Sequence, residues 1–496
     1  MSAREVVQAH VSRIACVNQR INALVVPLFE QALREAEAAD ARREQSAPLP
    51  PLHGLPITLK ECLDWQDTPS TCGLAARRAD RAAASDPHVL KLVRAGAIVI
   101  GKTNVPQALI FNESVNTVYG RTCNPWRLNR TPGGSSGGEA ALIAAGGSPL
   151  GLGTDIGGSL RLPASFCGIV SLKPTTARLP DRTRYGAQPL AFGPVASVVG
   201  PMAREVDDLT LALRVLLADS PVGFTEPDLV DLRALRVAYY TEDPLFEPAP
   251  AVVRAVNEAV SALRAHGAHV VPWTPPDVDE ALGLYVRMLT ADAAALIRQA
   301  LGDEQPLPEI ALLAWLARRS RRALRILTPL LRLLGQGTFA TQVQHLGFSA
   351  SDRACFVEEA RAYALRFAQA LDEAQGGPFD LIVCPVCFSP AWLHGDSRFL
   401  VTGGAYCVLY NLLGYPAGVA PVVTVEPSEA HYPSFPGLDV ARWVAWRVQR
   451  GSIGLPVGVQ VIARPNQEHL VLAALKAIHV DARRRGLFPA TLPTLL

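Results

Sequence analysis

Long hydrophobic runs are missing from this chain of 496 residues. No stretch reaches the roughly 18 uninterrupted apolar residues that mark a membrane-spanning helix. The first residues, MSAREVVQAHVSRI, also lack the basic start and following apolar run of a secretory signal peptide. The sequence therefore predicts a cytoplasmic protein with no transmembrane segment or signal peptide, in which any contact with a membrane is peripheral.

Charged residues are scarce, at 19% of the chain against a usual share of roughly 25%. Apolar residues make up 49%, which favours a large buried core and argues against disorder. The chain holds 47 Lys and Arg and 45 Asp and Glu. This near balance gives no reason to expect a nucleic acid partner.

Cysteines are few and odd in number, with nine scattered along the chain. This usage indicates reduced thiols rather than a disulfide framework. Cys384 and Cys387 form a CxxC motif, but no second pair accompanies them to complete a zinc site. The segment Val-Cys-Pro around Cys384 is typical of the end of a buried strand, so a structural role is favoured over a redox or metal role.

Helical and strand-like patterns alternate along the whole chain, which predicts an α/β fold around a central sheet. We expect two helices within residues 2–44 and further helices at 88–95, 139–145, 204–218, 250–266 and 466–485. We expect strands at 55–60, 97–100, 235–240, 380–384, 416–425 and 456–463. No repeat and no long linker interrupts the pattern, so residues 1–496 are expected to form a single domain.

Two motif matches conflict with their surroundings. Residues 96–103 fit the phosphate-loop pattern G-x-x-x-x-G-K-[ST], but the intervening Ala-Ile-Val-Ile favours a strand, and Asn104-Val-Pro106 follows where a helix is required. Gly133-Gly-Ser135-Ser-Gly137 fits the nucleophile elbow G-x-S-x-G, which requires a strand directly before it. Loop-forming residues 124–132 stand there instead, so both interpretations are rejected.

A second Gly-Gly-Ser, at residues 157–159, is better equipped for nucleophilic chemistry. Two glycines before Ser159 provide unhindered N–H groups that can point at one oxygen beside the nucleophile. A serine still needs a base, because its hydroxyl hardly ionises at neutral pH. Lys60 ends an apolar strand-like run, where burial would lower its pKa. Ser135, in its glycine-rich loop, is suited to bridge the lysine and the nucleophile.

Lys60, G-G-S-S-G-G at 133–138 and G-T-D-I-G-G-S-L-R at 153–161 together resemble the amidase signature family of serine hydrolases. Similar segments run through nearly the whole chain: P-I-T-L-K-E (56–61), G-K-T-N-V-P-Q (101–107), N-P-W (124–126), F-C-G-I-V-S-L-K-P-T (166–175), G-P-M-A-R (200–204) and G-L-P-V-G-V-Q-V-I-A (454–463). Within the family, Y-N-L-L-G-Y-P-A-G-V (410–419) and S-S-G-G-E resemble the branch that cleaves fatty-acid amides.

The resemblance implies an amidase signature fold, in which a large central mixed β-sheet is flanked by α-helices on both faces. It places the catalytic core segment at residues 60–175. Ser159 becomes the acylated nucleophile, Ser135 the bridging serine and Lys60 the base. The mechanism needs no metal or organic cofactor.

The family pattern also implies an oxyanion hole formed by backbone N–H groups of four consecutive residues, Ile156, Gly157, Gly158 and Ser159. Thr154 flanks the nucleophile and either lines the substrate site or braces the loop. Leu109 either lines an acyl channel or belongs to the ordinary core.

Residues 305–337 are expected to form a hydrophobic and basic helical cap. From Ile310 to Gln336 there are six arginines and no acidic residue, and Pro329 is expected to break the segment into two short helices. Apolar faces with a basic rim are typical of an interfacial membrane helix, and a buried hairpin with arginines at its rim is the alternative. The resemblance favours membrane docking through 309–337.

The predicted function is hydrolysis of fatty-acid amides, such as N-acylethanolamines or primary fatty amides, to a free fatty acid and an amine or ammonia. An amidase for small aliphatic or aryl amides is the alternative. A glutaminase subunit of a tRNA-dependent amidotransferase and a catalytically dead membrane-associated scaffold are less favoured. The small-molecule substrate's head group is left open, as is the oligomeric state, for which a homodimer is one candidate.

Overall fold

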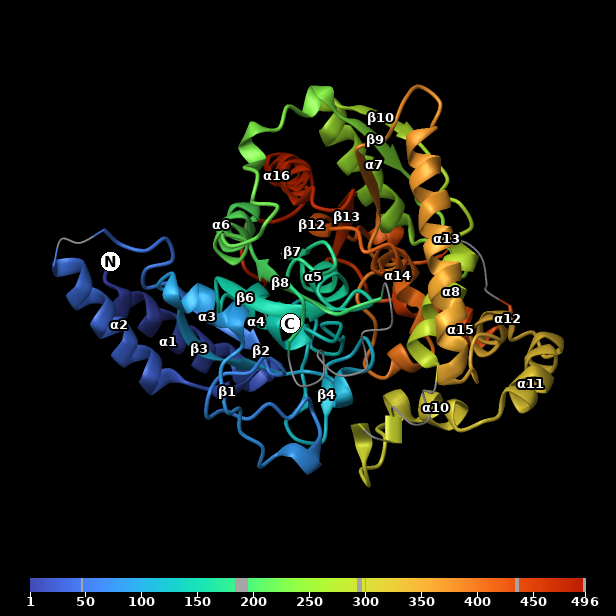
Figure 1. Cartoon of the computed structure of the whole chain (residues 1–496), viewed down its shortest axis with the longest axis horizontal. Helices are drawn as coiled ribbons and strands as arrows, with labels where there is room; N and C mark the ends of the chain where they lie inside the picture. The colour runs from blue at the N-terminus through green and yellow to red at the C-terminus, as the bar shows by residue number, and fades with distance from the viewer. Residues whose placement is uncertain (46–47, 183–194, 292–296, 299, 433–436, 494–496) are drawn as a thin grey trace.

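One sheet of eleven strands forms the centre of the molecule (Figure 1). The structure is a computed structural model that describes residues 1–45, 48–182, 195–291, 297–298, 300–432 and 437–493. The strand order is β1-β3-β2-β6-β8-β7-β12-β13-β11-β9-β10. These strands are β1 (Leu24–Pro27), β2 (Pro56–Lys60), β3 (Ile98–Thr103), β6 (Leu150–Asp155), β7 (Val170–Lys173), β8 (Val198–Ala203), β9 (Arg236–Tyr239), β10 (His269–Pro272), β11 (Leu381–Pro385), β12 (Ala417–Thr424) and β13 (Pro456–Ala463).

The sheet is mixed, as predicted. Strand β2 runs parallel to both of its neighbours, β3 and β6, whereas β6 and β8 are antiparallel. The N-terminal half of the chain supplies one side of the sheet, and β12 and β13, from the C-terminal region, lie between β7 and β11. The short strands β4 (Val115–Asn116) and β5 (Gly120–Arg121) form a separate pair.

Helices cover both faces of the sheet. On β6, Leu150 and Leu152 join the core cluster that includes α3 (Pro87–Arg94) and α6 (Val206–Leu216). The intervening Gly151 faces α4 (Gly137–Ala144), because a Cβ there would meet the Glu139 side chain. Side chains alternate between the faces of a strand, so α3 and α6 lie opposite α4. Further helices are α1 (Ala3–Ile21), α2 (Phe29–Glu44), α5 (Arg161–Cys167), α7 (Pro250–Ala265), α8 (Val278–Thr290), α13 (Arg353–Asp372), α14 (Ala405–Leu412), α15 (Val440–Gln449) and α16 (Glu468–Arg484).

The predicted strands and helices are confirmed, with ends that differ by a few residues. The largest difference is β3, which was expected to end at Ile100 and continues to Thr103. Gly101, Lys102 and Thr103 therefore lie in a buried strand, which agrees with the rejection of a phosphate loop. Lys102 donates to Ser70 Oγ at 2.9 Å inside the protein.

The expectation that Pro329 ends a helix is wrong. Helix α10 covers Pro308–Ala317, and α11 covers Arg321–Leu333 with Pro329 in its interior. The break lies at Ser320, whose hydroxyl accepts from the Ala323 N–H at 3.3 Å and caps α11. Among the described residues, no helix has the length and apolar character needed to cross a bilayer.

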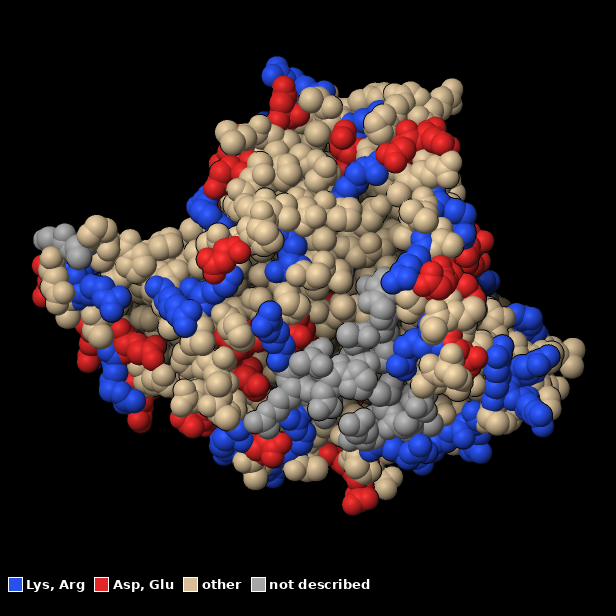
Figure 2. Space-filling model, in the orientation of Figure 1, with Lys and Arg blue, Asp and Glu red and all other residues tan. Residues whose placement is uncertain are grey.

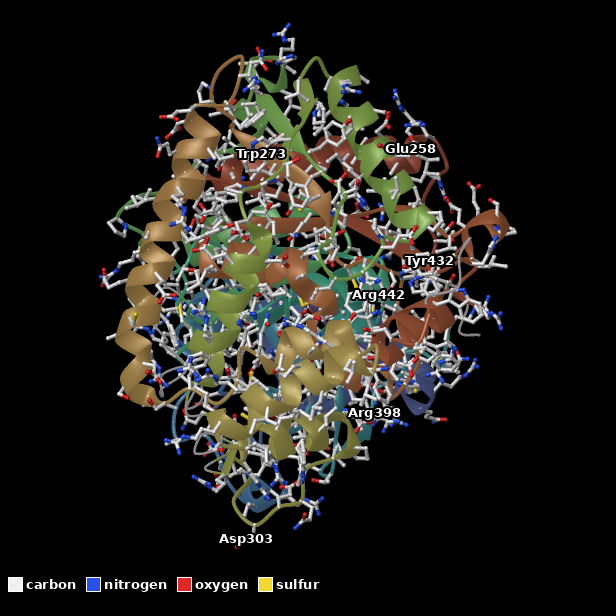
Figure 3. The ribbon with its side chains drawn as sticks, turned by 90° about the vertical axis from the view of Figure 1, so that its right-hand side faces the viewer. Glu258, Trp273, Asp303, Arg398, Tyr432 and Arg442 are labelled. Atoms are coloured by element: carbon white, nitrogen blue, oxygen red, sulfur yellow. The ribbon has the colours of Figure 1, made fainter. Side chains whose placement is uncertain are left out.

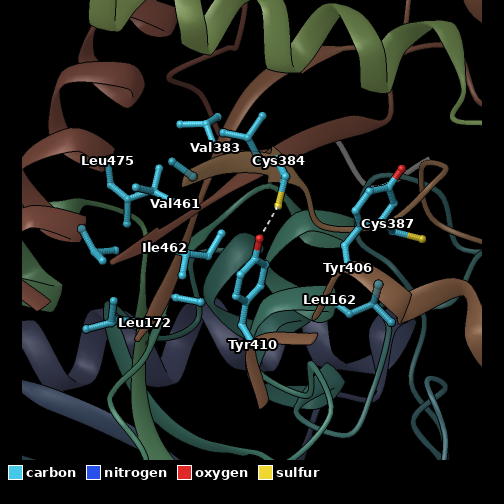
Figure 4. Packing of buried hydrophobic residues seen from close by; sticks show 14 of the residues in the cluster. Leu162, Leu172, Val383, Cys384, Cys387, Tyr406, Tyr410, Val461, Ile462 and Leu475 are labelled. Carbon is cyan, nitrogen blue, oxygen red and sulfur yellow. Dashed lines mark hydrogen bonds between the residues drawn. The ribbon is translucent and has the colours of Figure 1, made fainter. Parts of the chain in front are cut away.

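The two CxxC cysteines lie in the core at the end of β11. Both are buried, and their thiols point in different directions (Figure 4). The Cys384 Sγ is 3.9 Å from the Tyr410 hydroxyl, and burial raises the pKa of both thiols. This placement agrees with the structural role that was favoured for the motif.

Candidate active site

Lys60 is the last residue of β2 and is completely buried. Its Nζ lies 2.7 Å from Ser135 Oγ and 2.7 Å from Thr154 Oγ1. Burial lowers the pKa of the Lys60 ammonium, although the nearby groups Cys62, Asp181 and Asp155 oppose this shift. The structure thus brings the predicted base and the predicted bridging serine into direct contact.

Ser135 lies in the glycine loop that leads into α4. The Gly134–Ser135 peptide bond is cis, and Ser135 itself is 4% exposed. A Cβ at Gly134 would lie 2.6 Å from the carbonyl oxygen of Phe111, so a larger residue does not fit. The residues between β5 and α4 contain turns and bends rather than a strand. The requirement of a nucleophile elbow is therefore not met at Ser135.

Glu139 anchors α4 to β2, which carries Lys60, and to the neighbouring β3. Its carboxyl group accepts hydrogen bonds from the hydroxyl groups of Thr58 on β2 and Thr103 on β3. Burial raises the pKa of Glu139 to about 7, although both hydroxyls and Lys60 act in the opposite direction. This link fixes the start of α4, and with it Ser135, against the end of β2.

Ser159 lies in the loop between β6 and α5 and is partly exposed. Its carbonyl oxygen accepts from the Ser136 N–H at 3.2 Å, which joins the two serine loops. The Ser136 hydroxyl is 3.3 Å from the Thr154 carbonyl, so Ser136 bonds to nearby backbone. Ser135, Thr154 and Ser159 all line the same cavity.

A buried ion pair braces the loop of Ser159. Arg161 Nε lies 3.1 Å from Asp155 Oδ2, and Asn411 Nδ2 donates to Asp155 Oδ1 at 2.9 Å. Although burial opposes it, the Arg161 guanidinium holds the pKa of Asp155 below its usual range. The Asp155 carboxylate also accepts from the N–H groups of Gly158, at 2.8 Å, and Leu160, at 3.1 Å.

The four N–H groups expected in the oxyanion hole fall into two classes. The Gly158 N–H donates to Asp155, so in this conformation it points toward the Asp155–Arg161 ion pair rather than into the cavity. The N–H groups of Ile156, Gly157 and Ser159 donate to no residue that the structure describes. All three residues line the cavity. They provide a set of donors with no protein acceptor, which is what an oxyanion requires.

The cavity has a volume of about 960 Å³ and extends from Ser135 and Ser159 toward α8, α10 and α12 (Gly337–Val343). Its lining includes Leu109 together with the neighbouring Ala108 and Ile110. Most other lining side chains beyond the serines are apolar, among them Leu282, Val286, Leu289, Leu313, Leu316 and Phe339. The cavity provides room for a long apolar group next to the serines.

Sequence reasoning missed some contributions to this site. Thr154 was expected either to line the substrate site or to brace the loop, and its hydroxyl is also the second hydroxyl partner of Lys60. Tyr285 of α8 lines the cavity and donates to the carbonyl oxygen of Ile156 at 3.1 Å. Thr154 lies within the sequence motif at 153–161, so its position gave a signal. Tyr285 lies far along the chain in an ordinary amphipathic helix, so no signal in the sequence marked it.

Known proteins resemble this chain over most of its length. The family model described as Amidase matches residues 5–472. Fatty-acid amide hydrolase 1 of Sus scrofa is 37% identical over 458 residues, which cover 86% of this chain and 75% of that protein. Fatty acid amide hydrolase 1 of Caenorhabditis elegans is 31% identical over 497 residues, or 96% of this chain and 85% of that protein.

The fold has a counterpart among solved structures. A structure of fatty acid amide hydrolase superposes with a TM-score of 0.80 at 24% identity, covering 97% of this chain and 83% of that one. That structural likeness supports the fold. The family match and the sequence identities above support the amide-hydrolysing chemistry. The chain belongs to the amidase signature family and is an amide-hydrolysing enzyme.

Proposed function

We propose that this enzyme hydrolyses fatty-acid amides through an acyl-enzyme on Ser159. The observation that carries the proposal is the apolar cavity of about 960 Å³ that starts at Ser135 and Ser159. Binding sites for small molecules are typically clefts of roughly this size with a few polar groups at one end. The names of the relatives from Sus scrofa and Caenorhabditis elegans point to the same class of substrate.

In the proposed mechanism, neutral Lys60 accepts a proton from Ser135 across their 2.7 Å contact. Ser135 accepts one from Ser159, and the Ser159 oxygen attacks the amide carbonyl. The resulting oxyanion is stabilised by the N–H groups of Ile156, Gly157 and Ser159. The proton returns through Ser135 to the leaving nitrogen, because an amine leaves poorly unless it is protonated. Water then hydrolyses the acyl-enzyme.

The test is hydrolysis of saturated primary amides of increasing chain length. We expect kcat/KM to rise toward long chains, because each methylene buried in the cavity contributes about 0.8 kcal/mol, or roughly fourfold. Ser159→Ala is the control and should abolish turnover of every member of the series. A preference for acetamide or benzamide would instead identify the small-amide amidase and reject the fatty-acid proposal.

We also propose that the enzyme docks on membranes through residues 309–337. Helix α11 has a packed face with Leu324 and Thr328, and an opposite face with Ile326, Leu330 and Leu333. These last three side chains are 67%, 51% and 83% exposed. An apolar strip open to water on an amphipathic helix is typical of an interfacial membrane contact.

Arginines flank the exposed strip of α11. Arg321, Arg325 and Arg332 recur at helical spacing along one side of the helix and line a groove of about 220 Å³ against α12. Figure 2 shows Lys and Arg gathered at the lower right, where Figure 1 places α10 and α11. Such a rim is suited to the phosphates of an anionic lipid surface.

Exposed apolar side chains from α15 and from the turn before it adjoin the same surface. Gln336, after α11, donates to the Leu438 carbonyl at 2.8 Å and accepts from the Val440 N–H at 3.0 Å. Leu438, Val440 and Trp443 are 82%, 45% and 39% exposed. Figure 3 faces this side, with the yellow helices α10–α12 toward the viewer. The proposed membrane surface thus extends beyond the predicted cap.

A further inference from the structure

Tyr285 of α8 holds one peptide group of the loop that carries the nucleophile. Its hydroxyl donates to the carbonyl oxygen of Ile156 at 3.1 Å. A Cβ placed on Gly157 would lie 2.3 Å from the same hydroxyl oxygen. The hydroxyl therefore sits directly against the Ile156–Gly157 peptide, and the glycine is required for that approach.

The geometry of a peptide group links this contact to the oxyanion hole. The Ile156 carbonyl and the Gly157 N–H belong to one planar unit, and in a trans peptide the two groups point in opposite directions. Among the described residues the only cis peptide is Gly134–Ser135, so this unit is trans. A carbonyl fixed on Tyr285 directs the Gly157 N–H away from α8.

We propose that Tyr285 is a positioning residue of the oxyanion hole, which orients and polarises the Ile156–Gly157 peptide so that the Gly157 N–H donates to the oxyanion. This inference rests on the proposed acyl transfer at Ser159. A hydrogen bond to a carbonyl strengthens the donor at the other end of the same amide, because bonds in a chain polarise one another. The Gly157 N–H has no acceptor among the described residues and is available for this role.

The surroundings of Tyr285 suit a permanent donor. The ring is 6% exposed, and burial together with the charge of Asp155 raises the pKa of its hydroxyl. The hydroxyl therefore keeps its proton across the working pH range. Because Tyr285 also lines the cavity, its ring is in addition part of the cavity wall. A test must separate the wall from the hydroxyl.

The variant Tyr285→Phe keeps the ring and removes only the hydroxyl. We expect kcat for a long-chain amide to fall about tenfold with KM changed by less than about twofold. This loss is smaller than the roughly 10²-fold cost of deleting a direct oxyanion donor, because the Gly157 N–H remains. Two ligands sharpen the readout: an alkylboronic acid, which forms a tetrahedral adduct on the serine, and the fatty alcohol of the same length, which does not.

Tyr285→Phe should weaken binding of the alkylboronic acid about tenfold and leave binding of the fatty alcohol unchanged. The matched control is Tyr363→Phe on α13, which also loses a hydroxyl donated to a backbone carbonyl, that of Pro276 at 2.6 Å, away from the cavity. This control should retain full kcat. Unchanged kcat in Tyr285→Phe, or equal weakening of both ligands, would overturn the inference and leave Tyr285 as a wall only.

Failure of this inference is distinguishable from failure of the proposed function. If the unaltered enzyme hydrolyses no amide in the chain-length series, the proposed function fails. The comparison of boronic acid and alcohol still tests Tyr285 in that case, because it requires only a nucleophilic Ser159 and its hole.

Discussion

At the scale of single residues, the proposed chemistry depends on a lysine whose neutral form is favoured by burial. Among the described residues, the hydrogen-bond partners of Lys60 are the hydroxyls of Ser135 and Thr154 and the Thr154 carbonyl, and none of them is a carboxylate. Hydroxyl groups solvate an ammonium less well than water or a carboxylate does. Desolvation therefore lowers the pKa of Lys60 and increases the fraction of the neutral form that accepts a proton.

The lowered pKa of Lys60 predicts how kcat/KM depends on pH. In the proposed mechanism the neutral lysine is the active form, so kcat/KM should rise with pH. The midpoint of this rise in the pH profile should lie below 10.5, the ordinary lysine value. Lys60→Ala should lower kcat by about 10²–10⁴-fold and remove this rise from the pH profile.

Ser135→Ala should slow turnover while Ser159 remains open to covalent labelling. Acylation found on Ser135 itself would contradict the assigned roles, as would a pH profile of the native enzyme without the rise in kcat/KM.

At the scale of secondary-structure elements, the register between α4 and β2 sets the distance from Ser135 to Lys60. Glu139 is the side chain that joins them, through Thr58 and Thr103. A buried carboxyl with a raised pKa binds its proton more tightly in the folded state. Its contribution to stability is therefore complete below the unfolded pKa of 4.5 and is lost as pH rises through about 7.

Glu139→Gln removes that titration. Relative to the variant, the free energy of unfolding of the native enzyme should fall between pH 4.5 and pH 7, by up to about 3 kcal/mol. Urea unfolding at several pH values measures the difference. Glu44→Gln, at the exposed end of α2, is the matched control and should follow the native enzyme. Parallel curves for the native enzyme and Glu139→Gln would show that the carboxyl does not titrate in this range.

The elements that the sequence predicts are those whose signals are local. Strand β13, for example, is a continuous apolar run that needs no partner to be recognised, and Ser159 is marked by its glycines. The position of β12 and β13 in the sheet was not predictable, because it depends on pairing with strands far along the chain. The role of Tyr285 was not predicted for the same reason, because its contact with Ile156 joins residues far apart in the sequence. The prediction at Pro329 was wrong because packing of α11 against α12 maintains a helix that the local preference of proline disfavours.

At the scale of the whole molecule, the apolar strip of α11 and the exposed part of α15 lie at one end, around the helices that line the cavity. Leu313 and Leu316 of α10 and Phe339 of α12 line the cavity, and α11 lies between these helices in the chain. On the proposed docking surface, a lipid substrate held in a bilayer would thus meet helices adjacent in the chain to those that line the cavity.

The docking surface can be tested with vesicles. Ile326→Glu/Leu333→Glu should reduce pelleting with phosphatidylglycerol vesicles at least about tenfold, because two exposed apolar side chains lose their transfer into lipid. Hydrolysis of a short, water-soluble amide should remain. Leu229→Glu/Val480→Glu places the same charges on exposed apolar positions elsewhere and is the control. Equal pelleting of both double variants would contradict docking through α11.

The contact between Tyr285 and Ile156 has a consequence for the order in which the chain is made. Lys60, Ser135 and Ser159 all belong to the first third of the chain and are synthesised before α8. Strand β7 likewise pairs with β12, which is synthesised much later in the chain. A nascent chain therefore carries all three proton-transfer groups without the element that orients its oxyanion hole. Hydrolysis would reach its full rate only when the late segments of the chain have been added.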